Sequence, residues 1–238
     1  LINSLANILP INNKTTGDIS DQLQNLFTPE GSTFAIWGLI YFLLFIFIIR
    51  ILIRPLNKKV KELIKLFIIN SILNSSWIFT WHYEYLVISL VVMLGILINL
   101  IQINQLLKNT RSWEDKITLK LPFTVYFGWI SIASIANVTA LLVSYKWNGL
   151  GISEELWTVV ILIFGVFIAL TQIIYFRQIA YTFVIIWAYF GIYRKHISLE
   201  EFNSGYPLII VVLVSCLVLL SLASLGLVLS NCKKKDRT

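Results

Sequence analysis

The chain has 238 residues, of which 58% are hydrophobic and only 13% are charged, against about 25% charged residues in a soluble domain. This composition excludes an ordinary soluble fold, because so much apolar surface could not be buried. The net charge of +7 would suit a nucleic-acid partner, but the basic residues lie in short loops between apolar runs. We therefore expect membrane lipid around the protein and no nucleic acid.

The apolar residues form runs of about 20 without a charge, the length at which a helix crosses about 30 Å of hydrocarbon. They predict an all-α, polytopic transmembrane helix bundle of about seven membrane spans. Before them, residues 1–10, LINSLANILP, look like the end of an apolar segment too short to cross, which indicates a processed signal or an earlier helix upstream. The predicted spans are residues 32–53, 66–81, 85–107, 121–143, 156–176, 179–193 and 208–230.

The charges of the loops are consistent with seven spans. With this assignment, 15 of the 19 basic residues would lie on one side of the membrane, and the other side would hold only Lys14, Lys146, Arg194 and Lys195. Because basic loops stay in the cytoplasm, the pattern predicts that the loop of residues 11–31 is outside and the tail of residues 231–238 is cytoplasmic. The assignment depends on a hairpin at Arg177-Gln178, whose loss would merge two spans.

The sequence carries few groups suited to catalysis. No Asp, Glu, Lys or Arg lies in the interior of a predicted span, which disfavours an ion-coupled carrier. His82 and His196 lie at predicted interfaces, and no spacing of Cys, His and acidic residues matches a metal site. A nucleophile elbow, a phosphate loop and paired carboxylates are absent from the sequence as well. The residues therefore favour a protein that is not an enzyme and has no resident cofactor.

Three stretches place amides and indoles where a membrane helix normally carries aliphatic side chains. In residues 70–81, NSILNSSWIFTW, these side chains recur at i, i+4, i+7 and i+11 and share one helical face: Asn70, Asn74, Trp77 and Trp81. Residues 34–41 and 126–137 carry similar stripes. An Asn side chain finds no water in hydrocarbon, so it should face another helix or a cavity. The stripes predict one shared interior, and a ligand pocket and a packing seam both fit this pattern.

The stripes resemble the translocator protein family, also called tryptophan-rich sensory proteins. Pro29 lies eight residues before Trp37, and Trp37-Gly-Leu-Ile-Tyr41 keeps the family's Trp-to-Tyr spacing. Leu73-Asn74-Ser-Ser-Trp77 is similar to the family's Leu-Asn-x-x-Trp motif. The motif of the family's last helix is matched at Tyr126, Trp129, Ala133 and Asn137.

The resemblance covers residues 27–143 and departs from the family pattern at Thr28, Val125 and the pair Trp81-His82. It implies a five-helix core whose first helix would lie before Leu1. The chain is thereby divided into a translocator-like core, residues 1–143, and a C-terminal extension with three spans and a basic tail, residues 144–238.

Members of this family bind porphyrins and, in some cases, sterols. The resemblance therefore implies an integral membrane protein that binds or moves such a hydrophobic ligand, a porphyrin such as haem or a sterol-like molecule. The loop around Pro29 would cap the cavity. Its lining would consist of Trp37, Tyr41, Asn74, Trp77, Tyr126, Trp129 and Asn137.

Two other functions remain open. A seven-span carrier or channel for a neutral solute would line its path with amides, for which the candidates are Asn99, Gln102, Asn104 and Gln172. A non-catalytic assembly subunit, in a homodimer or a larger membrane complex, would use the stripes only as seams between helices.

Overall fold

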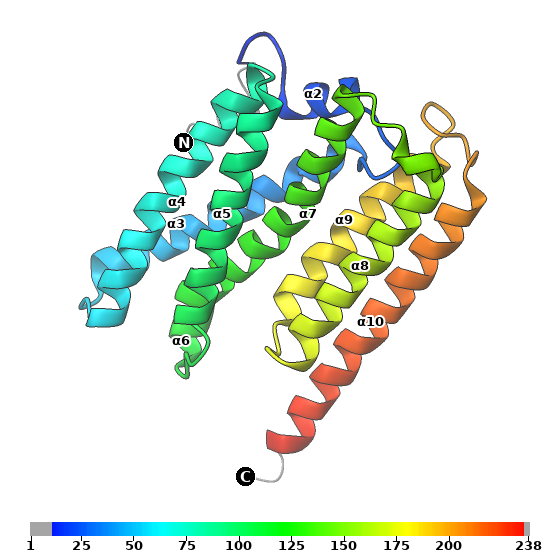
Figure 1. Cartoon of the computed structure of the whole chain (residues 1–238). Coiled ribbons are helices and arrows are strands. Elements are labelled where there is room, and N and C mark those ends of the chain that lie inside the picture. The colour runs from blue at the N-terminus through cyan, green and yellow to red at the C-terminus, as the bar shows by residue number, and fades with distance from the viewer. Residues whose placement is uncertain (1–10, 236–238) are drawn as a thin grey trace. The chain divides into compact units, whose positions relative to one another are not determined.

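The computed structural model describes residues 11–235, with side chains as far as residue 230, and this part of the chain is helical without a β-strand (Figure 1). The predicted all-α fold is therefore confirmed. The apolar segment of residues 1–10 and the side chains of the basic tail, residues 231–238, lie outside the described residues.

Six helical stretches are long and apolar enough to cross a membrane: Gly31–Ile53, Lys58–His82, Leu86–Leu106, Trp113–Ser144, Glu154–Ile174 and Pro207–Ser230. Their main helices are α3 (Ile36–Ile53), α4 (Lys58–His82), α5 (Leu86–Leu106), α7 (Leu121–Ser144), α8 (Glu154–Ile174) and α10 (Pro207–Lys235). The remaining predicted span forms helix α9 (Ile179–Ile197). Helix α9 is not among the six, because Arg194, Lys195 and His196 make its last turn polar. A helix thus forms at each predicted place, but six of the seven are candidate spans.

Helix α4 begins earlier than the sequence predicts. We expected a basic loop over residues 54–65, yet α4 starts at Lys58, where the Asn57 side chain caps the helix by accepting from the N–H of Val60 at 2.9 Å. Val60 and Leu63 are buried, whereas Lys58 and Lys61 are exposed. The first turns of α4 are therefore amphipathic, and their lysines remain in water beyond the apolar stretch.

The chain folds into two compact units. The first contains the chain up to Asn25 and residues 34–146, and in it α5 packs between α4 and α7 (Figure 1). Helix α3 packs on α7, and the short helix α2 (Thr16–Gln22) packs on α4. The short helix α6 (Trp113–Asp115) and one π-helical turn, Lys116–Lys120, precede α7.

The second unit contains residues 26–33 and 147–238, with helices α8, α9 and α10 packed against one another. Helix α8 begins with the predicted cap, in which Ser153 Oγ accepts from the N–H of Leu156 at 3.3 Å. Tyr189 of α9 lies at the centre of the unit and donates its hydroxyl to the carbonyl of Leu162 at 2.7 Å. This bond ties α9 to α8 through a side chain that is fully buried.

Residues 26–33 belong to the second unit although they lie between α2 and α3 in the sequence. Three α9 residues at helical spacing hold them. Trp187 Nε1 donates to the carbonyl of Thr33 at 2.9 Å, and the carbonyl of Gly191 accepts from the N–H of Glu30 at 3.2 Å. Arg194 forms an ion pair with Glu30 at 3.0 Å. One face of α9 therefore fixes the backbone of this 26–33 segment.

His196 holds the start of the same segment. Its Nε2 lies 2.9 Å from the carbonyl of Leu26, so this nitrogen carries the proton and donates. Burial lowers the pKa of His196, which favours the neutral ring, and the ring stacks on Phe202 at a centroid distance of 4.7 Å. Glu154 of α8 accepts from the N–H of Leu26 at 3.0 Å. Both backbone groups of Leu26 are thus bound by side chains.

Gly191 lets the 26–33 segment lie directly on α9. A Cβ at this position would stand 2.0 Å from Thr33 Oγ1 and 2.8 Å from Thr33 Cγ2, which is too close for the segment to stay in place. We expect Gly191→Ala to destabilise the second unit by about 1–3 kcal/mol, as overpacking usually does, and to lower the thermal unfolding midpoint in detergent.

Gly226→Ala on α10 is the matched control. A Cβ there would meet nothing within 4 Å, and alanine favours a helix over glycine, so the midpoint should stay the same or rise. Equal midpoints for the two variants would show that the segment does not pack closely on α9.

Candidate functional site

The seven predicted site residues all lie in the first unit, where α3, α4 and α7 bring them together. Trp37 of α3 is their centre. Its ring centroid lies 5.5 Å from that of Tyr41, 6.3 Å from Trp77, 5.8 Å from Tyr126 and 6.3 Å from Trp129. Trp37, Trp77, Tyr126 and Trp129 are each at most 3% exposed. The rings pack on one another and fill the centre of this unit.

Asn137 of α7 joins the three helices around these rings. Its Oδ1 accepts from Trp77 Nε1 of α4 at 3.3 Å and from Ser89 Oγ of α5 at 2.9 Å. Its Nδ2 donates to the carbonyl of Ala133 at 3.1 Å. The amide is therefore fully engaged, and the two donors that it receives come from different helices.

Tyr41 and Asn74 complete the predicted set at its edge. Both side chains are half-buried, and the Tyr41 hydroxyl interacts with the Asn74 side chain at a geometry poorer than a standard hydrogen bond. The Tyr41 ring lies nearly parallel to Trp37, with an interplanar angle of 12°. This pair extends the aromatic centre along α3.

Two polar atoms at the centre have no partner among the described residues. The Tyr126 hydroxyl and Trp129 Nε1 are buried and make no hydrogen bond, although both can donate one. Each lies on a ring that contacts Trp37. Since most buried polar side-chain atoms are paired, two unpaired donors beside one ring cluster are unusual.

Three further residues contact the site, and the predicted set did not include them. Phe34 lies 5.8 Å from Trp129, edge to face, and Trp81 stacks on Trp77 at 5.8 Å. Ser89 was missed because a single hydroxyl in an apolar run can equally bond its own backbone. A signal was present, since Ser89, Met93, Ile96 and Leu100 recur at helical spacing and are all buried.

Pro29, the predicted cap of the cavity, lies in the 26–33 segment and belongs to the second unit. Its role as a cap stays a prediction.

The amides proposed for a solute path do not form one row. Asn99 and Asn104 are buried on α5, where Asn99 accepts from Asn70 at 3.0 Å and Asn104 accepts from Thr124 at 3.1 Å. Gln102 lies on the exposed side of the same helix, and Gln172 belongs to the second unit. The two buried amides bond neighbouring helices and act as packing contacts.

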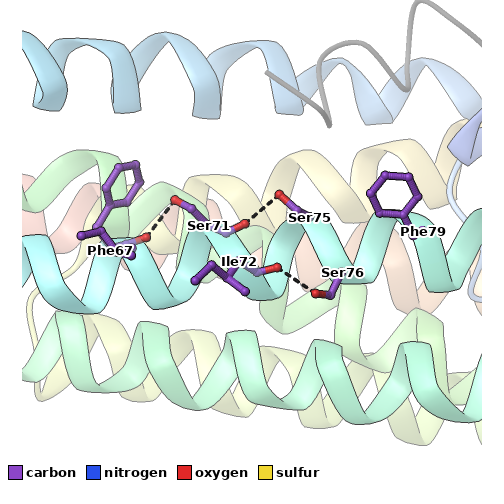
Figure 2. A pocket seen from close by; sticks show the side chains of 7 residues that line it. Phe67, Ser71, Ile72, Ser75, Ser76 and Phe79 are labelled. Atoms are coloured by element: carbon purple, nitrogen blue, oxygen red, sulfur yellow. Dashed lines mark hydrogen bonds between the residues drawn. The ribbon is translucent and has the colours of Figure 1, made fainter.

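A groove lies along α4, away from these rings (Figure 2). It is open, has a volume of about 440 Å³, and is lined by Phe67, Ile68, Ser71, Ile72, Ser75, Ser76 and Phe79. Figure 2 shows each of the three serines bonded to the backbone of its own helix, four residues earlier, at 2.8–3.0 Å. Their hydroxyls are thereby satisfied inside hydrocarbon, and none of the predicted site residues lines this groove.

A family model described as TSPO-like protein matches residues 1–226. The chain belongs to the TSPO-like protein family. No curated protein and no solved structure shows significant similarity to it. The match includes α8, α9 and most of α10, so both units of this TSPO-like chain fall within the family description. Together with the six apolar helices, it identifies an integral, multi-pass membrane protein in a lipid environment.

Asn137 gives a test of how this TSPO-like site is held together. Asn137→Ala leaves the buried donors of Trp77 and Ser89 without an acceptor, so we expect a loss of about 1–3 kcal/mol in the free energy of unfolding in detergent. Ser89→Ala removes only one bond and should cost about 0.6 kcal/mol, the average for such contacts in membranes.

Ser131→Ala serves as a control on the same helix. Its hydroxyl bonds the carbonyl of Phe127 within α7, so its loss should leave stability nearly unchanged. If Asn137→Ala were as stable as Ser131→Ala, the amide would not hold the three helices together.

Proposed function

We propose that this membrane protein binds or moves a flat hydrophobic ligand, porphyrin or sterol-like, among the rings that surround Trp37. The observation that carries the proposal is the pair of unpaired donors, the Tyr126 hydroxyl and Trp129 Nε1. A buried polar group without a partner costs about 1–3 kcal/mol, so it is rarely kept without a use. An acceptor on a bound ligand would satisfy one or both donors.

The surrounding rings suit the body of such a ligand. Trp37 stacks on Tyr41 and Trp77 stacks on Trp81, at interplanar angles of 12° and 21°. A flat macrocycle or a sterol skeleton would replace one of these ring neighbours, and the helices would separate to admit it. The acceptor would be a carboxylate of the porphyrin or the hydroxyl oxygen of the sterol. No covalent chemistry is required, so we propose binding or transfer without catalysis.

An assembly subunit is the second candidate function. The bonds from Asn137 to Trp77 and Ser89, and from Asn70 to Asn99, support it, because a packing seam needs no ligand. It leaves the two unpaired donors without an explanation. The solute path is the weaker alternative, since Asn99 and Asn104 already bond neighbouring helices.

Two variants that keep an aromatic side chain at the altered position test the ligand site. Tyr126→Phe removes the unpaired hydroxyl and Trp129→Phe the unpaired indole N–H. We expect each to weaken binding roughly threefold to tenfold, the effect of one lost hydrogen bond. Tyr126→Phe should leave the ligand-free protein equally stable or more stable, because it deletes a buried group that has no partner. Binding is measured by quenching of tryptophan fluorescence with protoporphyrin IX and, in a second series, by binding of cholesterol to the purified protein.

Tyr189→Phe in the second unit is the control. Its hydroxyl is bonded to Leu162, so this variant should lower stability and leave binding unchanged, the opposite of Tyr126→Phe. The ligand proposal would be refuted if quenching rose linearly without saturation, or if both Tyr126→Phe and Trp129→Phe bound the ligand as well as the wild type. The assembly subunit would then be the better supported function.

We also propose that the loop of residues 11–31 is outside and that the tail of residues 231–238 is cytoplasmic. The proposal is supported by the excess of basic residues in residues 54–65 and 108–120. Helix α9 must then cross as well. The part of α9 before Arg194 corresponds to about 22 Å of helix, so the polar last turn would have to lie at the level of the headgroups.

Cysteine labelling in intact cells tests this orientation. In a chain carrying Cys216→Ser and Cys232→Ser, a membrane-impermeant maleimide should label Asn13→Cys and should not label Arg111→Cys until the cells are opened. Labelling in the reverse order would invert the topology.

A further inference from the structure

One end of the first unit gathers most of the protein's positive charge. Residues 50–65 and 108–120 hold ten basic and three acidic residues, a net charge of +7. Side-chain contacts bring these stretches together. Arg50 at the end of α3 pairs with Asp115 at 3.1 Å, and Lys59 at the start of α4 donates to Thr110 Oγ1 at 3.1 Å. The charges therefore share one end of the helices and are not spread along the chain.

Two of the three arginines of this end, Arg50 and Arg54, already have acidic partners. Glu114 accepts from both Nε and Nη2 of Arg54, at 3.1 and 3.2 Å, and also lies 3.6 Å from Arg50. Asp115 is bound to Arg50. Two of the three carboxylates of this end are thus engaged, and positive charge in excess remains on the lysines.

Lys59, Lys116 and Lys120 form an uncompensated group, which we name the lysine cluster. Lys116 and Lys120 stand four residues apart on the π-helical turn before α7, and Lys59 lies on the first turn of α4. Among the described residues, none of the three ammonium groups forms an ion pair with a carboxylate within 4.0 Å, and the hydrogen bond of Lys59 to Thr110 brings no negative charge. Three like charges from two elements destabilise one another unless an anion lies among them.

The surroundings of the lysine cluster indicate where that anion is. Lys120 is half-buried at the start of an apolar helix, so its stem packs on the protein while its ammonium reaches the surface. Trp113, one turn before Lys116, is 75% exposed. An exposed tryptophan beside a membrane helix end is typical of the level at which lipid headgroups lie.

The π-helical turn itself follows from the sequence. Pro122 opens α7 and has no N–H, and its ring would clash with the carbonyl four residues earlier in a regular helix. A π-turn, with bonds from i to i+5, widens the backbone at this place, and such turns are frequent at functional sites. It carries Lys116 and Lys120 at its two ends.

We propose that the lysine cluster is a binding site for the phosphate of an anionic phospholipid. The phosphate would neutralise the three ammonium groups, which have no other counter-charge among the described residues. The site is separate from the rings around Trp37, so a lipid here does not compete with the ligand proposed there.

The test measures binding of phosphatidylglycerol and phosphatidylcholine to the full chain by native mass spectrometry from a neutral detergent, at about 0.15 M ionic strength, where charges more than about 8 Å apart are screened. The variant carries Lys116→Gln and Lys120→Gln. We expect the wild type to prefer phosphatidylglycerol, and the variant to bind it roughly tenfold to thirtyfold more weakly.

The matched control carries Lys61→Gln and Lys65→Gln, which removes the same charge from exposed positions of the same end. It should retain the wild-type preference within about twofold, because these lysines lie outside the cluster and are screened. An equal loss in both variants would mean diffuse attraction without a site, and no preference in the wild type would refute the proposal. Equally tight binding of soluble glycerophosphate would place the ligand in water and overturn the assignment to lipid.

Discussion

The first unit depends on the requirement that polar groups in hydrocarbon find partners within the protein. Asn137 shows how this is met, since one amide accepts from α4 and α5 while remaining bonded to its own helix. Asn70 with Asn99, and Asn104 with Thr124, repeat the arrangement nearer the other end of the helices. Apolar packing alone would not distinguish one rotation of a membrane helix from another, because lipid tails are as apolar as leucine. The hydrogen bonds of the amides favour one rotation of each helix about its own axis. In this rotation the rings of Trp77 and Trp129 lie beside Trp37.

The Tyr126 hydroxyl and Trp129 Nε1 are distinguished by their place, because Thr16 Oγ1 and His82 Nε2 of the same unit are also buried without a hydrogen bond. The rings of Tyr126 and Trp129 both contact Trp37 at the centre of the unit. The serines that line the groove along α4 bond their own backbone, and the buried amides of α5 bond a neighbouring helix. The Tyr126 hydroxyl and Trp129 Nε1 do neither. Phenylalanine at both positions would serve a packing seam equally well. Packing alone therefore does not explain the Tyr126 hydroxyl or the indole N–H of Trp129. The acceptor of the proposed ligand would explain them.

Helical periodicity allowed much of this unit to be predicted from the sequence. In an apolar helix, amides and indoles at i, i+4 and i+7 lie on one face, and that face should be buried. The sequence therefore predicted that Asn74, Trp77, Tyr126 and Trp129 face one shared interior. Ser89 could not be singled out, because a hydroxyl in a membrane helix can equally bond its own backbone and face lipid, as Ser71 does. The early start of α4 was missed because its lysines resemble a loop until Val60 and Leu63 are seen to be buried. Nothing in residues 26–33 indicated that this loop would pack on α9, more than 150 residues later in the chain, since most of its bonds use backbone groups that any sequence provides. The side chain of Glu30 is the exception, because it pairs with Arg194.

The 26–33 segment is held within the second unit by several independent bonds. Trp187 binds the carbonyl of Thr33, Gly191 accepts from the N–H of Glu30, and Arg194 pairs with the Glu30 carboxylate. His196 and Glu154 bind the two backbone groups of Leu26. Because α8 and α9 both contribute, the loss of any one bond leaves the segment held by the others. The close contact at Gly191 is different, since a Cβ there would collide with Thr33 and the remaining bonds could not relieve the collision.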